Sequence, residues 1–344
     1  MNKDDYIKLN KYLNDIFNYL EKNDKYLFIY LNNIYNISMH INESFNDLYF
    51  DDNETTNNLS FIDIIYHVEN IIKKIDCKYI PDLKNIINNG ELNFSYNKEE
   101  EGNYFLNDNG LGIINIDREY NFQDVINLAH EFGHYLCNKG KKQTRLGYLL
   151  DEFIGRYFEI QAVEYLINNG YKENELKSSL LIEYLLDNTY EFIKNYPLIL
   201  MYYHFGAIDL ESRKLFCKYF YSIDEDDFNE LCQEKLELLD YIKSEYLKEC
   251  SNNSFVVDES ELIYEMSKIF SEDYRYILGT VLALYPLSKN DIIDLVDNLN
   301  TEKYENLTLS DIFLKLNIDI NSDTFIKNMD DSINEYYKSI KKVM

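Results

Sequence analysis

The sequence has 344 residues, enough to bury a sizeable core in one or two domains, and its composition indicates neither disorder nor a fibre. Its 34 basic and 61 acidic side chains give a formal net charge of −27, which disfavours binding to phosphate backbones or anionic membranes. We therefore expect neither nucleic acid nor a membrane among the partners of this protein.

The first ten residues are charged and amidic, and no segment reaches the roughly 20 apolar residues of a membrane span. The cysteines are scattered and lack paired spacing, which fits free thiols in a reducing compartment. They are Cys77, Cys137, Cys217, Cys232 and Cys250. These features together predict a cytoplasmic protein.

Few helix breakers occur in the chain, which has only three prolines and eleven glycines. From Tyr6 to about Ile87 the apolar residues recur at helical spacing, with one acidic, Asn-rich interruption near Asp51 to Asn58. The pattern predicts a mainly α fold and an N-terminal helical region over residues 1–90.

Between Glu91 and Asp117 the pattern changes from helical spacing to alternation of apolar and polar residues. Charged and Asn/Gly-rich turns, KEEEG and NDNG, divide this stretch into three short runs. The apolar positions are Leu92, Phe94, Tyr96, Tyr104, Leu106, Ile113, Ile114 and Ile116. We expect a small antiparallel β-sheet here.

The helical spacing resumes at Asn121, which can cap a helix that runs to Asn138 before Gly140. A second helix, about Leu149 to Asn169, is apolar nearly all round and is therefore expected to be buried. More helices follow to the C-terminus. No repeat or linker marks a boundary after Glu91, so we expect residues 91–344 to form one unit.

The segment LAHEFGHYL carries the chemistry. His130 and His134 are four residues apart, so both imidazoles lie on one face of a helix and can reach one tetrahedral zinc ion. Glu131 can hold the catalytic water, which completes the HExxH pattern of metallopeptidases. The sequence therefore predicts one zinc ion per chain; the alternative is a pair of core histidines.

A catalytic zinc ion of this kind needs a third protein ligand. The second helix offers Glu152, Arg156 and Glu159 as one polar stripe on an otherwise apolar cylinder. We favour Glu152 as the ligand and Glu159 as the carboxylate that orients a ligand histidine, although their order could be reversed. An internal salt bridge between Arg156 and the two glutamates is the alternative.

HEFGH in the stretch DVINLAHEFGH, followed by two glutamates seven apart in DEFIGRYFE, resembles the thimet oligopeptidase and oligoendopeptidase F family. The resemblance implies a compact helical zincin in which Glu152 binds zinc, Glu159 supports the site and Gly155 lets the two helices approach closely.

A second segment, DYRYILGTVLALY, is similar to the C-terminal segment of that family. This similarity implies that Tyr274 and Tyr276 stabilise the oxyanion, with Gly279 following them. Core tyrosines are the alternative. The family also has a histidine before these tyrosines, and this chain has none after His204.

The function that follows is a zinc metalloendopeptidase acting on short unfolded peptides, with Glu131 as general base. An edge strand at Gly112 to Ile116 would pair with the extended substrate, so that Gly112, Ile113, Ile114 and Asn115 bind it.

One rival is a compact HExGH peptidase that cleaves a specific protein such as a repressor, with Glu159 as third ligand. The other is a non-catalytic zinc-containing binding protein. His204 is expected to be a core or cleft residue.

Overall fold

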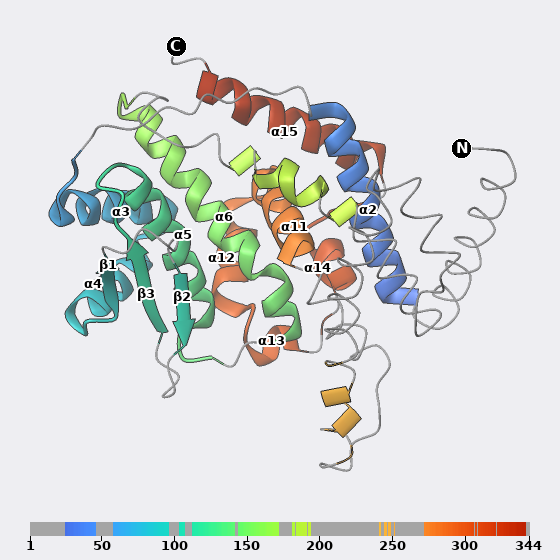
Figure 1. The fold of residues 1–344 in the computed structure, drawn as a ribbon, viewed down its shortest axis with the longest axis horizontal. Coiled ribbons are helices and arrows are strands. Elements are labelled where there is room, and N and C mark those ends of the chain that lie inside the picture. Colours follow the sequence, from blue (N-terminus) through green and yellow to red (C-terminus); the bar gives the residue numbers. More distant parts are fainter. Residues whose placement is uncertain are drawn as a thin grey trace, which may run out of the picture. The chain divides into compact units, whose positions relative to one another are not determined.

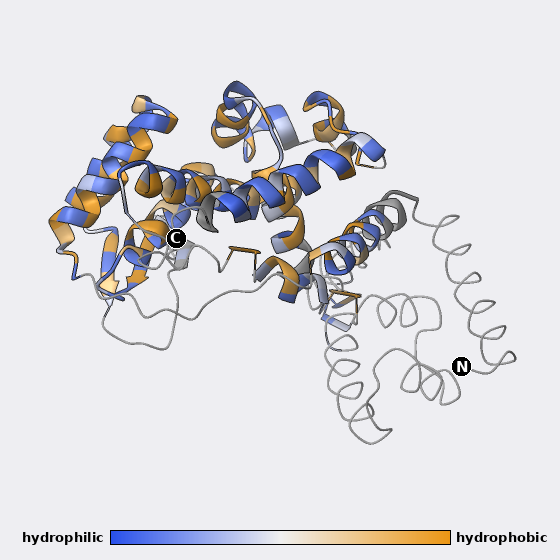
Figure 2. Ribbon diagram, turned by 90° about the horizontal axis from the view of Figure 1, so that it is seen from above, coloured by the Kyte–Doolittle hydropathy of each residue, from blue (hydrophilic) through white to orange (hydrophobic). Residues whose placement is uncertain are grey.

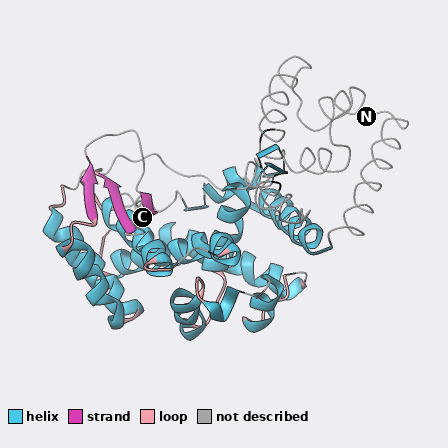
Figure 3. Ribbon diagram, turned by 90° about the horizontal axis from the view of Figure 1, so that it is seen from below, coloured by secondary structure: helices cyan, strands magenta, loops and turns pink. Residues whose placement is uncertain are grey.

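A computed structural model describes residues 25–45, 58–95, 103–106, 112–141, 144–171, 272–305, 307, 309–320 and 322–341, with short helical pieces within 181–193 and 241–251. Helices dominate this part of the chain, and one small sheet accompanies them (Figure 3). The predicted mainly α fold is therefore confirmed. Among the described residues, no helix combines the length and the apolar character that a bilayer crossing requires.

The chain divides into two compact units, Met1–Asp47 with Leu186–Tyr274 and Leu48–Leu185 with Arg275–Met344. The first unit contains helix α2 (Lys25–Phe45), whose buried side chains recur every three or four residues. These are Ile34, Ile37, Ile41 and Phe45. The second unit contains the predicted zinc motif and the sheet.

The described elements of the second unit are mostly helices (Figure 1). Before the zinc motif come α3 (Phe61–Ile75), η1 (Cys77–Tyr79), α4 (Ile80–Asn88), β1 (Leu92–Ser95), β2 (Asn103–Leu106) and β3 (Gly112–Asp117). Then come α5 (Gln123–Asn138), α6 (Arg145–Asn168), α11 (Glu272–Leu284), α12 (Lys289–Asn298), α13 (Glu302–Glu305), α14 (Leu309–Lys315) and α15 (Asp323–Lys341). Apolar and polar stripes along many of these helices are visible in Figure 2. Such amphipathic helices bury one face in a shared core.

The sheet has the strand order β1-β3-β2. β2 pairs with β3 in antiparallel fashion, but β1 pairs with β3 in parallel, with Leu92 opposite Ile114. The prediction of a wholly antiparallel sheet is thus wrong, because alternation marks strands and does not determine their neighbours. β3 takes the middle position, where Ile114 and Ile116 are both 0% exposed.

The middle position of β3 also corrects the predicted role of Gly112 to Ile116 as an edge strand. Both main-chain edges of β3 are already paired, one with β1 and one with β2. An extended peptide needs unpaired N–H and C=O groups along a strand to add to a sheet. Main-chain pairing of a substrate with β3 is therefore ruled out in this arrangement.

Helix α5 follows β3 after a tight connection that two polar side chains fix. Asn121 Oδ1 accepts a hydrogen bond from the Gln123 N–H at 2.7 Å, although the N-cap position itself is Phe122 and not the predicted Asn121. Asp124, in the first turn, accepts hydrogen bonds from the N–H groups of Glu119 and Tyr120 and from Arg118 Nε. These contacts set the direction in which α5 leaves the sheet.

Helix α6 starts one turn earlier than predicted, because Thr144 caps it by accepting a hydrogen bond from the Gly147 N–H. It crosses α5 at two glycines. A Cβ on Gly133 would lie 3.2 Å from Gly155 Cα, and a Cβ on Gly155 would lie 2.9 Å from His130 Nε2. Side chains at these positions would push the helices apart, so the close approach predicted for Gly155 is confirmed.

Helix α11 reaches the same region from far along the chain. A Cβ on Gly279 would lie 2.9 Å from the carbonyl carbon of Glu152, so this glycine lets α11 pack directly on the α6 backbone. Apolar residues around Gly279, including Ile277, Leu278 and Val281, are fully buried. The segment that resembles the C-terminal motif therefore lies beside the predicted third ligand.

Candidate metal centre

The α5 helix places two imidazole rings one turn apart on the face that meets α6. The Nε2 atoms of His130 and His134 are 3.0 Å apart, and the two side chains are 13% and 10% exposed. This proximity follows from the helical repeat, because residues i and i+4 lie one above the other on one face. The two nitrogens are thus directed at one point.

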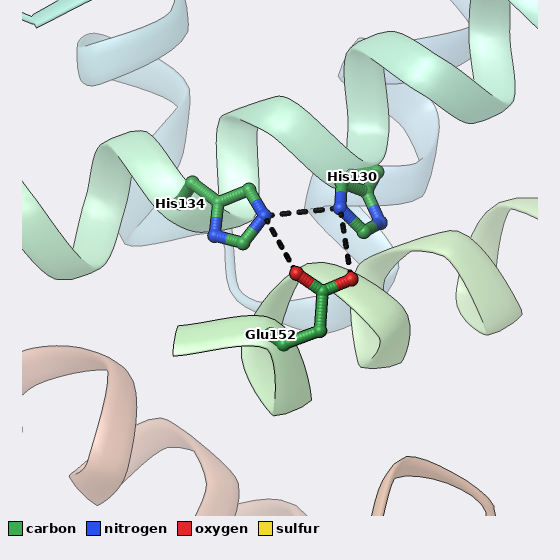
Figure 4. A group of neighbouring side chains, drawn as sticks. All are labelled: His130, His134 and Glu152. Atoms are coloured by element: carbon green, nitrogen blue, oxygen red, sulfur yellow. Dashed lines mark hydrogen bonds and ion pairs between the residues drawn. The ribbon is translucent and has the colours of Figure 1, made fainter. Parts of the chain in front are cut away.

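Glu152 of α6 completes the cluster, as Figure 4 shows. Its Oε1 lies 3.6 Å from His130 Nε2 and its Oε2 lies 3.7 Å from His134 Nε2. Zinc–ligand bonds of about 2.0–2.2 Å in a tetrahedron require donor atoms about 3.3–3.6 Å apart. The observed separations, 3.0 to 3.7 Å, lie close to that spacing, so these three residues could hold one metal ion.

Each imidazole also contacts a carboxylate through its other ring nitrogen. Glu159 Oε2 lies 3.1 Å from His130 Nδ1, and Asp151 Oδ1 lies 3.0 Å from His134 Nδ1. Carboxylates in this position fix the ring orientation and the tautomer of a metal-binding histidine. The first contact matches the predicted role of Glu159. The second was missed, although Asp151 directly precedes Glu152 in the sequence.

Arg156 lies between the two glutamates that the sequence singled out. Its Nε is 3.0 Å from Glu152 Oε1, and its Nη1 is 2.7 Å from Glu159 Oε2. The internal salt bridge and the metal-binding cluster are therefore not alternatives, because both occur in one arrangement. Arg156 offsets the repulsion between two carboxylates that point into the same buried region.

The described charged side chains around the cluster carry an excess of negative charge, which favours binding of a divalent cation. Glu131, Asp151, Glu152 and Glu159 are all less than 9% exposed. Opposite them, Arg156 forms the ion pairs given above, and Arg275 lowers the pKa of Asp151. Among the described residues, four carboxylates facing two guanidinium groups leave two negative charges, and burying such charges without partners is costly. A divalent ion would neutralise them.

The titration behaviour of the site reflects the same excess of negative charge. Burial raises the pKa of Glu131, and the nearby Glu152 and Asp151 raise it further against the opposing effect of the two histidines. Burial alone would lower the pKa of His134, but Asp151, Glu152 and Glu131 outweigh it and raise this pKa to about 9. In the protein alone, a proton on His134 thus supplies part of the positive charge that the site requires.

The C-terminal tyrosines lie on α11, next to α6. The half-buried Tyr276 has its ring centre 5.6 Å from the guanidinium carbon of Arg156. Tyr274 belongs to the same helix, but its side chain is outside the described residues. Tyr276 thus contacts Arg156, which in turn contacts Glu152 of the cluster. Its role as an oxyanion donor stays a prediction.

The other histidines have different surroundings. His67 is 8% exposed and lies among aromatic rings, with its centroid 5.6 to 5.9 Å from those of Tyr66, Phe122, Tyr165 and Tyr171. Burial lowers its pKa, so this imidazole is a neutral core side chain. His204 is outside the described residues.

Comparison with known proteins yields a fold relationship. No family model and no curated protein matches this sequence. The chain is similar to a solved structure from Chlamydophila abortus described as a "putative peptidase", with a TM-score of 0.52 and 13% sequence identity. The similarity covers 96% of this chain and 55% of that one, so this chain spans about half the length of that protein. At this level of identity the two proteins share a fold, and here that fold contains a buried His/His/Glu cluster.

Proposed function

We propose that this chain is a zinc metallopeptidase that hydrolyses peptide bonds in short, unfolded peptides. The observation that carries the proposal is the cluster of His130, His134 and Glu152, whose donor atoms lie within 4.8 Å of one another, next to the buried Glu131. Three protein ligands leave one position open on a tetrahedral ion, as in catalytic zinc sites, whereas structural sites are closed by four. This favours an enzyme over a non-catalytic zinc-containing protein.

A zinc ion held by these residues would act as a Lewis acid that lowers the pKa of a bound water molecule to about 7. Glu131, adjacent to His130 on α5, is the carboxylate in position to accept the proton from the attacking water and to deliver it to the leaving amine. Glu159 and Asp151 hold the two imidazoles in orientation from behind. Arg156 keeps the Glu152 carboxylate in place beside them.

We assign the chain to the neighbourhood of the thimet oligopeptidase and oligoendopeptidase F family. The Glu152–Glu159 spacing and the close helix contacts at Gly155 and Gly279 support this assignment. The solved structure with the similar fold carries a peptidase description, which supports a peptidase without selecting a family. The repressor-cleaving alternative needs Glu159 as a ligand, and Glu159 instead contacts the His130 nitrogen that points away from His134.

We propose the outer edge of β2 (Asn103–Leu106) as the place where an extended peptide binds. β2 is an outer strand of the described sheet, so its far edge is not paired with another described strand. The Tyr104 ring contacts the Tyr135 ring of α5 with centroids 6.3 Å apart, which places this strand beside the helix that bears the histidines. The inner edge of β2 is already paired with β3, at Gly112, Ile113, Ile114 and Asn115, and this pairing would hold β2 in place while its outer edge binds the peptide.

A digestion assay tests the proposed activity. The purified protein should cut a mixed library of short peptides, since strand pairing requires an extended chain, and leave a natively folded protein intact. Mass spectrometry of both incubations provides the measurement. A chelator should stop cleavage, and added zinc should restore it. Efficient cutting of the folded protein with the peptides untouched would contradict the proposal.

The role proposed for Tyr276 has its own test. A phenol that donates to the developing oxyanion acts mainly in the transition state, and loss of one such donor typically lowers kcat by about 10²–10³-fold. We therefore expect Tyr276→Phe to reduce kcat by about that factor while zinc content and Tm stay nearly unchanged. Tyr285→Phe, just beyond α11, is the matched control, because its hydroxyl accepts a hydrogen bond from Asn328 instead. Near-normal kcat in Tyr276→Phe would remove this residue from the mechanism.

A further inference from the structure

A side chain from a distant part of the sequence forms hydrogen bonds with both helices that carry the cluster. Helix α5 ends at Asn138, and Thr144 caps the start of α6 a few residues later. Asn300 lies just beyond the end of α12 and is 5% exposed. It contacts both of these helix ends.

The Asn300 amide is satisfied at both of its polar atoms. Its Nδ2 donates to Asn138 Oδ1 at 2.8 Å and to the Cys137 carbonyl at 3.3 Å. Its Oδ1 accepts from the Thr144 N–H at 2.9 Å and from Thr144 Oγ1 at 3.2 Å. A Cβ on Gly147 would lie only 1.7 Å from Asn300 Oδ1, so the absence of a side chain there makes room for the amide. Asn300 therefore fixes the end of α5 relative to the start of α6.

The contact continues from Asn138 to the candidate metal centre. Asn138 Nδ2 donates to the His134 carbonyl at 2.9 Å and to Asp151 Oδ1 at 3.1 Å. The same oxygen, Asp151 Oδ1, lies 3.0 Å from His134 Nδ1. Asn300, Asn138, Asp151 and His134 thus form an unbroken polar chain, and all four are less than 9% exposed. In such a buried environment polar contacts are strong and their loss is poorly compensated by water.

We propose that Asn138 and Asn300 are positioning residues of the metal centre: they hold the Asp151 carboxylate against His134 so that His134 Nε2 faces His130 and Glu152. The inference rests on the proposed function, because it assigns these amides a role toward the metal ion that the site would bind. Asparagine suits position 138, since its amide donates to a carboxylate oxygen while remaining uncharged, and it suits position 300, since its amide donates to one helix end and accepts from the other. The amides act on the metal site through Asp151 and do not touch the ion.

Asn138→Asp tests the link to Asp151. The variant keeps the oxygen that accepts from Asn300, but it replaces the donor that faces Asp151 with a second carboxylate. Loss of an outer partner of a metal-binding histidine typically weakens metal affinity about 10–100-fold, and we expect a change of that size in the Kd for zinc. Competition with a chromogenic chelator measures this Kd. The visible absorption spectrum of the cobalt-loaded protein should shift as well, because the His134 ligand is reoriented.

Asn298→Asp is the matched control. Asn298 Nδ2 also donates to a carbonyl four residues earlier, Asp294 O at 2.9 Å, and to a carboxylate, Asp294 Oδ1 at 2.8 Å. It makes these contacts away from the cluster, so this variant should keep the zinc Kd and the cobalt spectrum of the wild type even if its Tm falls. The comparison separates positioning of the metal ligand from a general loss of stability.

If Asn138→Asp does not fold, Asn300→Ser removes the amide that links the end of α5 to the start of α6 without adding charge. We expect this variant to bind zinc about tenfold more weakly.

The inference is overturned if folded Asn138→Asp or Asn300→Ser keeps the wild-type zinc Kd and cobalt spectrum. Failure of the proposed function gives a different result in the wild-type protein itself, which would then either bind zinc without cutting peptides or bind neither zinc nor cobalt.

Discussion

Replacing Glu131 with glutamine should lower kcat by about 10²–10⁴-fold while the protein still holds one zinc ion per chain. The amide matches the carboxylate in shape but cannot accept a proton from water. The three residues of the cluster are unchanged in this variant, so metal binding should persist. Elemental analysis and peptide turnover, measured on the same preparation, provide both quantities.

Glu164→Gln is the control for this substitution. Glu164 lies on α6, is exposed and pairs with Lys74, so its loss should alter neither zinc content nor turnover. Full activity of Glu131→Gln would mean that another group accepts the proton, and the proposed mechanism would have to be abandoned. Loss of zinc from this variant would instead indicate that Glu131 supports metal binding.

Removal of a metal ligand should have the second large effect. His130→Ala and Glu152→Ala are each expected to lose zinc and, with it, all measurable turnover, because two remaining ligands hold the ion poorly. Glu159→Ala should keep zinc when the ion is in excess but bind it about 10–100-fold more weakly, since Glu159 orients His130 from behind. Zinc content after dialysis and the zinc Kd distinguish the two classes of variant.

The opposite ranking would have a clear meaning. If Glu159→Ala released zinc and Glu152→Ala retained it, Glu159 would be the third ligand and the repressor-cleaving architecture would be favoured. Melting temperatures in the presence of a chelator show whether either alanine variant has simply unfolded. Binding to the native state raises Tm, so a variant that still binds zinc is stabilised by the added ion.

The local features of the site could be predicted from the sequence. The imidazoles of His130 and His134 converge because they are four residues apart on one helix, and helical geometry alone ensures this. Glu152 and Glu159 face the histidines because most of α6 is apolar, so the buried polar stripe that they form with Arg156 has to meet polar partners. The glycine at 155 likewise indicated a close approach of two helices.

The strand order was not available from the sequence. Alternation identified the strands, yet nothing in it determined that β1 would pair in parallel with β3 and leave β3 in the middle. Neighbour choice depends on how the strands pack against the rest of the chain, here with Ile114 and Ile116 of β3 buried and α5 packed against β3. The proposed peptide-binding edge therefore had to move from β3 to β2.

Residue spacing within the two helices by itself limited the candidate metal-binding cluster to His130, His134 and one of Glu152 and Glu159, because the helical repeat is a local property of the chain. Only the tertiary structure decided what surrounds that cluster. Asp151 reaches His134 because of the angle and depth at which α6 crosses α5, and Arg156 pairs with both glutamates in the same buried space. Asn300 meets Asn138 across 162 positions of sequence, a contact that arises from packing of α12 and that no local pattern encodes.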